Sequence, residues 1–259
     1  MAGSEKYQLL APGDTFPFTC KPECWGRCCA ATTIRVDPWD LLRIARGVGV
    51  ATGELLKVCT FYRGEKHPLP VVCLVRRGRC PFLSGDGRCL IYRCRPRVCR
   101  AFPVGEIVEI GDEGRLERGY LLMHAASCQG FDPEAPRYRP AEWLAREGVT
   151  PEDMAQTEQF LRFLREAKER LAWSAWLDET GAWTVLRLLY DPDGWRERCG
   201  VGPAVSDALF WERSLKAAWC FLVQRAAHQD IDAVRIGEIL RGEMEAPFPW
   251  EGSGSEDFA

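Results

Sequence analysis

The 259-residue chain has little lysine and histidine and no long apolar stretch. Six lysines stand against 28 arginines, and histidine occurs three times. The absence of about 18 consecutive uncharged apolar residues excludes a transmembrane helix. The first residues have neither the basic start nor the apolar core of a secretory signal, so we expect a cytoplasmic protein. A formal net charge of −3 gives no general attraction to nucleic acid or to an anionic membrane.

Several enzyme signatures are also missing. The chain contains no nucleophile elbow, no P-loop, no dinucleotide-binding fingerprint and no Cys-x-x-Cys motif of the thioredoxin type. Hydrophobic residues nevertheless make up 46% of the sequence, which is enough for a sizeable core in one or two domains. The sequence therefore predicts a folded protein for which none of these signatures supplies a catalytic residue.

Cysteine, by contrast, is abundant and clustered. Eleven of the 13 cysteines lie between Cys20 and Cys128. In a reducing compartment, clustered thiols bind metal or carry out redox chemistry more often than they form disulfides, and an odd number does not suit complete pairing. We therefore expect a metal site, and its candidate ligands share short sequence spacings. They are Cys20, Cys24, Cys28, Cys29, Cys80, Cys89, Cys99 and Cys128.

The number of candidate ligands leaves the number of centres open. A tetrahedral zinc site and a [4Fe-4S] cluster each use about four thiolates. Eight thiols allow one eight-thiol arrangement, two four-ligand sites, or one site with a redox pair. The simplest alternative is that cysteines are small buried apolar residues, and we favour it for the four whose neighbours are apolar. These are Cys59, Cys73, Cys199 and Cys220, while Cys94 is ambiguous.

Arginines accompany the second group of thiols. Eight fall between Arg76 and Arg100, against a single acid, Asp86. A four-thiolate centre carries net negative charge, which neighbouring arginines can offset while donating hydrogen bonds to sulfur. We predict this cofactor-binding role for Arg95 and Arg100. A solvated charged face is the simplest alternative, and few aromatic residues accompany the run, so nucleic-acid binding is not expected.

Histidine offers one further candidate. His124 lies four residues before Cys128 and could be a ligand or a proton carrier, although a lone histidine is more often structural. No residue can be assigned a catalytic role from the sequence.

The fall in cysteine density after Cys128 predicts two regions and a tail. We expect an α+β fold in which a small Cys-rich, metal-stabilised domain over 15–135 is followed by an all-α helical region over 140–246. The proline-rich stretch 131–140 suits a connector, and the tail 247–259 suits disorder. The helical region could contact another protein, and its tryptophans are expected to fill its core. They are Trp173, Trp176, Trp183, Trp211 and Trp219.

Periodicity and capping signals predict the main elements. Asp37 and Pro38 begin a helix that Gly47 and Gly49 end, and a short helix follows that Thr52 would cap. A buried strand is expected over 69–75, and a hairpin over 104–110 and 115–123 around the turn 111–114. Further helices are expected from Thr150 toward Leu177, over 181–190, over 206–227 and over 232–241.

One rival from another class is the radical S-adenosylmethionine enzyme, whose cluster motif is Cys-x3-Cys-x2-Cys. The second gap here, between Cys24 and Cys28, is three residues rather than two. The chain also lacks the repeated βα pattern of a barrel. This class is therefore not favoured.

Six short motifs of the Cys-rich region match a known family. They are Cys80-Pro-Phe-Leu83, Cys89-Leu-Ile-Tyr92, Arg95-Pro96, Cys99-Arg100-Ala-Phe102-Pro103, Gly26-Arg-Cys28-Cys29 and Cys128-Gln-Gly130. Together they resemble the CxxCxxCC family of zinc- or iron-chelating domains, the YkgJ-type cysteine cluster proteins, over residues 16–130. The first cluster departs from the family in having two gaps of three residues, which leaves open whether Cys20 and Cys24 both ligate.

The resemblance implies a zinc or iron centre, of which an iron–sulfur cluster is one form. One branch of the family resembles flagellin lysine N-methylases. Two hypotheses follow. In the first, the centre is structural or handles electrons, and the domain presents the helical region to a partner. In the second, the protein is a lysine N-methylase-like enzyme with the cluster near its active site.

Overall fold

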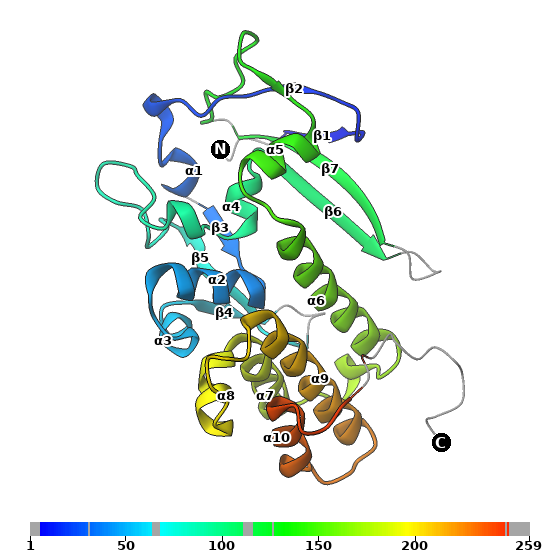
Figure 1. Cartoon of the computed structure of the whole chain (residues 1–259). Coiled ribbons are helices and arrows are strands. Elements are labelled where there is room, and N and C mark those ends of the chain that lie inside the picture. The colour runs from blue at the N-terminus through cyan, green and yellow to red at the C-terminus, as the bar shows by residue number, and fades with distance from the viewer. Residues whose placement is uncertain are drawn as a thin grey trace. The chain divides into compact units, whose positions relative to one another are not determined.

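The computed structural model describes residues 6–30, 32–63, 68–110, 116–125, 127–246 and 248. It is an α+β protein, as expected (Figure 1). Its contacts divide the chain into two units, Met1–Val36 with Cys73–Met154 and Asp37–Val72 with Ala155–Ala259. None of the helices in the described part of the chain combines the length and apolar character needed to cross a bilayer.

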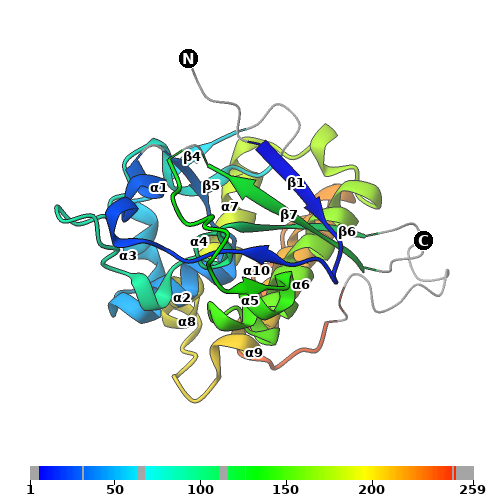
Figure 2. The same ribbon diagram turned by 90° about the horizontal axis from the view of Figure 1, so that it is seen from above.

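A three-stranded antiparallel sheet organises the first unit. Its order is β1 (Lys6–Leu10), β7 (Leu116–His124) and β6 (Val104–Ile110), and Figure 2 shows the three strands side by side. Leu121 lies opposite Leu9 on one side and Gly105 on the other. The two strands of the predicted hairpin are thus confirmed, and its turn residues lie outside the described part of the chain.

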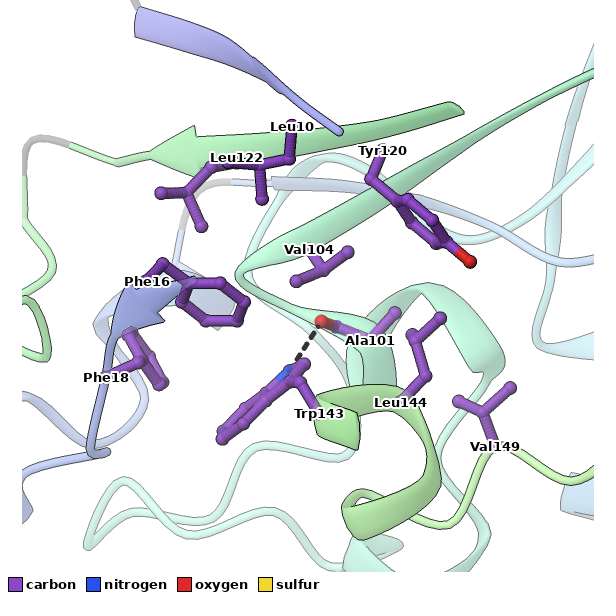
Figure 3. Close-up of a cluster of buried hydrophobic side chains, with 10 residues drawn as sticks. All are labelled: Leu10, Phe16, Phe18, Ala101, Val104, Tyr120, Leu122, Trp143, Leu144 and Val149. Atoms are coloured by element: carbon purple, nitrogen blue, oxygen red, sulfur yellow. Dashed lines mark hydrogen bonds between the residues drawn. The ribbon is translucent and has the colours of Figure 1, made fainter. Parts of the chain in front are cut away.

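Below the sheet lies a compact apolar cluster (Figure 3). Phe18 packs edge-on against Trp143, with ring centroids 5.2 Å apart. The Trp143 indole N–H donates to the carbonyl of Ala101 at 2.9 Å, so its one polar group is satisfied in the core. The cluster joins residues from both ends of the first unit. They are Leu10, Phe16, Phe18, Ala101, Val104, Tyr120, Leu122, Trp143, Leu144 and Val149.

A second strand pair lies nearer the cysteines. β3 (Thr32–Arg35) runs antiparallel to β5 (Val71–Gly78), with Thr32 opposite Gly78. The predicted strand over 69–75 is therefore confirmed, shifted toward its C-terminal end. The shorter elements of the first unit are β2 (Phe16–Pro17), η1 (Pro22–Cys24), α1 (Arg27–Ala30), η2 (Tyr92–Cys94), α4 (Arg97–Ala101), β8 (Arg137–Tyr138) and α5 (Pro140–Arg146).

The predicted connector is part of the first unit's fold. β8 pairs with β2, Phe16 opposite Tyr138, and α5 follows immediately. α5 was not expected from the sequence. It is held because Trp143 enters the apolar cluster, which the proline content of this stretch does not reveal.

The second unit is mainly helical, and the chain reaches it twice. The first visit supplies α2 (Pro38–Val48), α3 (Thr52–Lys57) and β4 (Thr60–Tyr62). Asp37 caps α2 by accepting from the backbone N–H of Asp40, and Gly49 ends it in the left-handed region, as predicted. Gly47, which was also expected to end the helix, lies inside it. The predicted cap of α3 is wrong, because Ala51 is the capping residue. The Thr52 hydroxyl instead donates to Asp191 at 3.0 Å.

The second visit supplies the remaining helices. α6 (Pro151–Glu169) begins in the first unit behind a Thr150–Asp153 capping pair. It ends before the predicted position, because Ala172 takes a left-handed backbone conformation ahead of η3 (Trp173–Ala175). The others are α7 (Glu179–Tyr190), α8 (Pro192–Cys199), α9 (Asp207–Ala226) and α10 (Ala233–Arg241), of which α8 was not predicted.

The helices of the second unit pack mainly around α7 and α9. α9 lies against α7 and α10, while α2 lies against α3 and α7. Trp173, Trp211 and Trp219 are buried in this core, and Trp176 and Trp183 are half-buried. The contact-defined units do not share the boundaries of the predicted regions 15–135 and 140–246. Residues 37–72 belong to the same unit as the C-terminal helices. The tail 247–259 lies outside the described residues, apart from Phe248.

Candidate metal centre

All eight predicted ligands belong to the first unit and come from four separate stretches of chain. Cys24 and Cys80 are buried, Cys20 and Cys28 are exposed, and the others are half-buried. None of the 13 cysteines forms a disulfide. A metal could therefore bind these thiols without any disulfide having to break.

Two glycines hold the first cysteine cluster against the Cys80–Cys89 loop. Gly26 and Gly87 both have positive φ angles, 77° and 83°. A Cβ on Gly26 would lie 2.8 Å from the carbonyl oxygen of Gly87, and one on Gly87 would lie 2.9 Å from that of Trp25. Only residues without a Cβ allow the two backbones to approach this closely.

Backbone contacts also join the Cys20 segment to the Cys128 segment. Thr19 N–H donates to the Gly130 carbonyl at 2.9 Å, and Lys21 pairs with Asp132 at 2.7 Å. The Cys128 sulfur accepts from the N–H of Gly130 at 3.4 Å. These contacts place Cys20 and Cys128 in neighbouring segments of the chain, although the two residues are 108 positions apart (128 − 20) in the sequence.

The β3–β5 pairing brings a third segment to the same place. The ladder that sets Thr32 opposite Gly78 continues outward to a hydrogen bond of 2.9 Å from Cys80 N–H to the Cys29 carbonyl. The stretch after Cys80 then folds back on itself, because Leu90 N–H donates to the Phe82 carbonyl at 2.8 Å. Cys89 lies on this returning arm, paired with Leu83.

Cys28 and Cys29 lie at the middle of this arrangement, on α1. Their sulfurs are 3.8 Å apart, so the two thiols share one hydrogen bond. That bond lowers the pKa of Cys28 to about 6, with help from the positive charge of Arg95. The same bond raises the pKa of Cys29, together with burial and the nearby thiolates of Cys28, Cys99 and Cys80. A thiolate at neutral pH is the form that binds metal.

Three more of the predicted ligands have raised pKa values, mainly because their thiols are partly buried. Burial raises the pKa of Cys20, and the thiolates of Cys24, Cys28 and Cys128 raise it further. Burial likewise raises the pKa of Cys89 and of Cys128. Mutual repulsion of this kind is expected where several thiols gather without a cation, and a metal would remove it.

Arg95 is placed among these thiols. Its guanidinium lies 3.9 Å from the centre of the Tyr92 ring, donates to the Cys99 carbonyl at 3.4 Å and pairs with Glu147 at 3.3 Å. Its charge lowers the pKa of Cys28 and opposes the rise at Cys20. This position is consistent with the predicted role of offsetting the charge of a thiolate centre.

Arg100 makes its hydrogen bonds with backbone carbonyls and with a carboxylate. The side chain is buried and bonds to the carboxylate of Asp153, the carbonyl of Gly148 and the carbonyl of Arg95. It thus connects α4 to the start of α6 within the first unit. Its predicted role at the centre stays a prediction.

The other candidates have separate surroundings. His124 stacks against Phe131, with ring centroids 4.3 Å apart. Cys59 and Cys73 are buried among apolar residues, whereas Cys199 and Cys220 are half-buried in helices of the second unit.

The side chains do not form a finished coordination sphere. Among the described residues, which include all eight predicted ligands, no group of three or more His, Cys, Asp or Glu side chains is placed to hold a metal ion. The donor chemistry nevertheless fits zinc or iron, because the gathered groups are thiols. Rotation of a cysteine side chain between staggered positions moves its sulfur by about 3 Å. A change of rotamer can therefore bring a sulfur nearer to its neighbours without moving the backbone.

Sequence reasoning missed the contacts that gather the ligands. The Gly26–Gly87 approach and the Lys21–Asp132 pair are both long-range. The Gly-x-Cys-Cys motif contains the first of these glycines, and that was the only available signal. Cys94 lies in η2, and its thiolate contributes to raising the pKa of Cys89, so it belongs to the same neighbourhood.

Comparison with known proteins covers the Cys-rich part alone. Residues 19–129 match the family model described as "CxxCxxCC: Putative zinc- or iron-chelating domain". No curated protein and no solved structure gives a significant match to the chain.

Proposed function

We propose, from the premise that residues 19–129 form a domain of the CxxCxxCC family, that the chain binds zinc or iron through cysteine thiolates. The proposed ligands are the eight clustered cysteines named above, and an iron–sulfur cluster is included as one form of the centre. The role is structural or electron-handling.

The observation that supports this proposal is the convergence of four cysteine-bearing stretches around Cys28 and Cys29. Thr19–Gly130 and Cys80–Cys29 are backbone hydrogen bonds, both of 2.9 Å, so they do not depend on how any thiol is turned. A protein core has no need to bring free thiols from distant segments together, because apolar residues fill space at less cost than repelling thiolates.

The chain's own residues would prepare the site in two ways. Burial of Cys24 and Cys80 keeps water from part of the ligand set, and Arg95 offsets negative charge. A bound metal would supply a rigid crosslink, or as iron an acceptor for single electrons.

The first test is elemental analysis with an absorption spectrum on protein purified without oxygen. Zinc in a colourless protein favours a structural site, whereas iron with sulfide and a broad visible band favours a cluster. Cys28→Ser and Cys99→Ser should each lower the metal content, and Cys220→Ser should leave it unchanged because Cys220 lies on α9. A chain that holds neither metal, as purified or after reconstitution, would overturn the proposal.

The enzymatic alternative has a different requirement. A lysine N-methylase-like enzyme needs an open coordination position or a cosubstrate pocket beside the metal. Methyl transfer to a protein substrate is therefore worth measuring if iron and sulfide are found. The contact of the helical region with another protein also stays a prediction.

A further inference from the structure

Cys28 and Cys29 are consecutive residues of α1. In a helix, successive side chains are about 100° apart around the axis, so consecutive residues do not share a face. The 3.8 Å between the sulfurs of Cys28 and Cys29 would suit two thiolates on one metal as well as thiolates of two neighbouring metals. The partners of each cysteine, rather than this distance, decide between the two arrangements.

One set of partners is assembled by the chain's outer segments. The Thr19–Gly130 hydrogen bond and the Lys21–Asp132 ion pair set Cys20 beside Cys128. Cys24 follows within one turn of η1, where its N–H and its sulfur both approach the Lys21 carbonyl. These contacts do not involve the Cys80–Cys99 stretch.

The other set is assembled by the β3–β5 ladder. It joins Cys80 to Cys29 through their backbones at 2.9 Å. The loop that starts at Cys80 returns Cys89 to the same end of the ladder, and α4, which carries Cys99, packs on β3. Neither contact involves Cys20 or Cys128.

The backbone contacts leave Cys28 as the fourth thiol of the first set, because Cys29 is joined to Cys80 through the backbone.

We infer that the domain holds two thiolate centres side by side, with Cys28 serving one and Cys29 the other. The first centre takes Cys20, Cys24, Cys28 and Cys128, and the second takes Cys29, Cys80, Cys89 and Cys99. This inference rests on the proposed metal binding and deepens it. Each set offers four thiolates, which is the number that a tetrahedral Zn²⁺ requires.

Zn²⁺ binding to the full-length, metal-free chain tests the division through pairs of substitutions. The wild type should bind about two Zn²⁺, and Cys28→Ser or Cys99→Ser about one each. The decisive comparison is between doubles. Cys28→Ser with Cys128→Ser removes ligands from one set and should still leave about one Zn²⁺, whereas Cys28→Ser with Cys99→Ser should leave none.

Each result has one meaning. Equal Zn²⁺ content in the two double variants, or a wild type that binds a single Zn²⁺, would overturn the two-centre division while metal binding itself stood. A wild type that binds no zinc and no iron overturns the proposed function instead. The two failures are therefore distinguishable.

A measurement on the unmodified protein covers the case in which the variants do not fold. The wild-type chain is half-loaded with Zn²⁺ and its free thiols are alkylated. Intact chains that retain one Zn²⁺ are then selected by native mass spectrometry and fragmented. Protection should fall wholly on one set in each chain, Cys20 with Cys128 or Cys29 with Cys80. Protection of Cys28 and Cys29 together, with ligands drawn from both sets, would overturn the inference.

Discussion

The guanidinium of Arg100 lies 2.8 Å from the carboxylate of Asp153, and both side chains are 3% exposed. This ion pair fastens α4, which carries Cys99, to the start of α6. A buried charge that loses its partner is costly, even where the intact pair adds little net stability.

Replacing either partner should therefore destabilise the first unit strongly. Arg100→Met leaves the Asp153 carboxylate buried without its guanidinium, and we expect a loss of about 3 kcal/mol in the free energy of unfolding. Urea unfolding of the metal-free protein measures it. Arg93→Met, at an exposed position four residues before α4 begins at Arg97, serves as the matched control, with an expected change below about 0.5 kcal/mol. Equal losses in the two variants would contradict the assignment.

Gly130→Ala should weaken the junction between the Cys20 and Cys128 segments. The new Cβ would lie 2.8 Å from Cζ of Phe18 and 2.9 Å from the carbonyl oxygen of Thr19. Relief of such overlap typically costs about 1–3 kcal/mol. Thermal unfolding should show the loss, and Gly85→Ala, where a Cβ meets nothing within 4 Å, should not. An unchanged unfolding temperature for Gly130→Ala would mean that the residues at this junction move to accommodate the new methyl group without loss of stability.

Arg95→Gln should weaken metal binding without unfolding the domain. The substitution removes the positive charge near the thiols while keeping a side chain that can hydrogen-bond. Partners of this kind are typically worth about 10–100-fold in metal affinity. Competition with a chelator measures the affinity for Zn²⁺. Arg93→Gln is the control, and a similar loss in both variants would show that only the total charge matters.

A pH-dependent stability is expected from Asp193 in the second unit. Arg46 donates to both of its carboxylate oxygens, at 2.8 and 2.7 Å, and the N–H of Thr52 adds a third bond at 2.8 Å. Burial raises the pKa of Asp193, but these bonds outweigh burial and leave the pKa below its ordinary value. Asp207 and Arg196 complete the charged surroundings.

The sign of the effect follows from that lowered pKa. Asp193 stabilises the folded unit above the carboxyl pKa of the unfolded chain, about 3.9, and this contribution is lost as pH falls through the lower folded value. Asp193→Asn should therefore cost about 1 kcal/mol at pH 7, and the difference from wild type should shrink below about pH 4. Thermal unfolding at several pH values measures it. The exposed Asp230→Asn is the control, and a difference that does not vary with pH would contradict the prediction.

Local signals in the sequence were sufficient for much of the fold. The caps at Asp37, Thr150 and Ser206 and the ending at Gly49 are short-range features, and the structure has each of them. α5 and β1 escaped prediction because their stability comes from partners far away in the chain, Trp143 in the apolar cluster and β7 in the sheet.

The candidate site, like the fold, could be predicted from the sequence only in part. Clustered thiols and the family pattern pointed to the ligands, but spacing alone left one centre, two centres and a redox pair equally open. The backbone bonds from Thr19 to Gly130 and from Cys80 to Cys29 join positions more than 50 residues apart, and no periodicity reports such contacts.

The chain's route through its two units gives the β3–β5 ladder a topological consequence. Cys29 and Cys80 enclose a loop of 51 positions (80 − 29), and that loop contains α2 and α3 of the helical unit. A crosslink across a loop of this length restricts the unfolded chain by about 4 kcal/mol in the chain-entropy model. A metal joining these two cysteines would accordingly restrain helices that supply it with no ligand. The redox state or the metal supply of one unit would then change the unfolding temperature of the other.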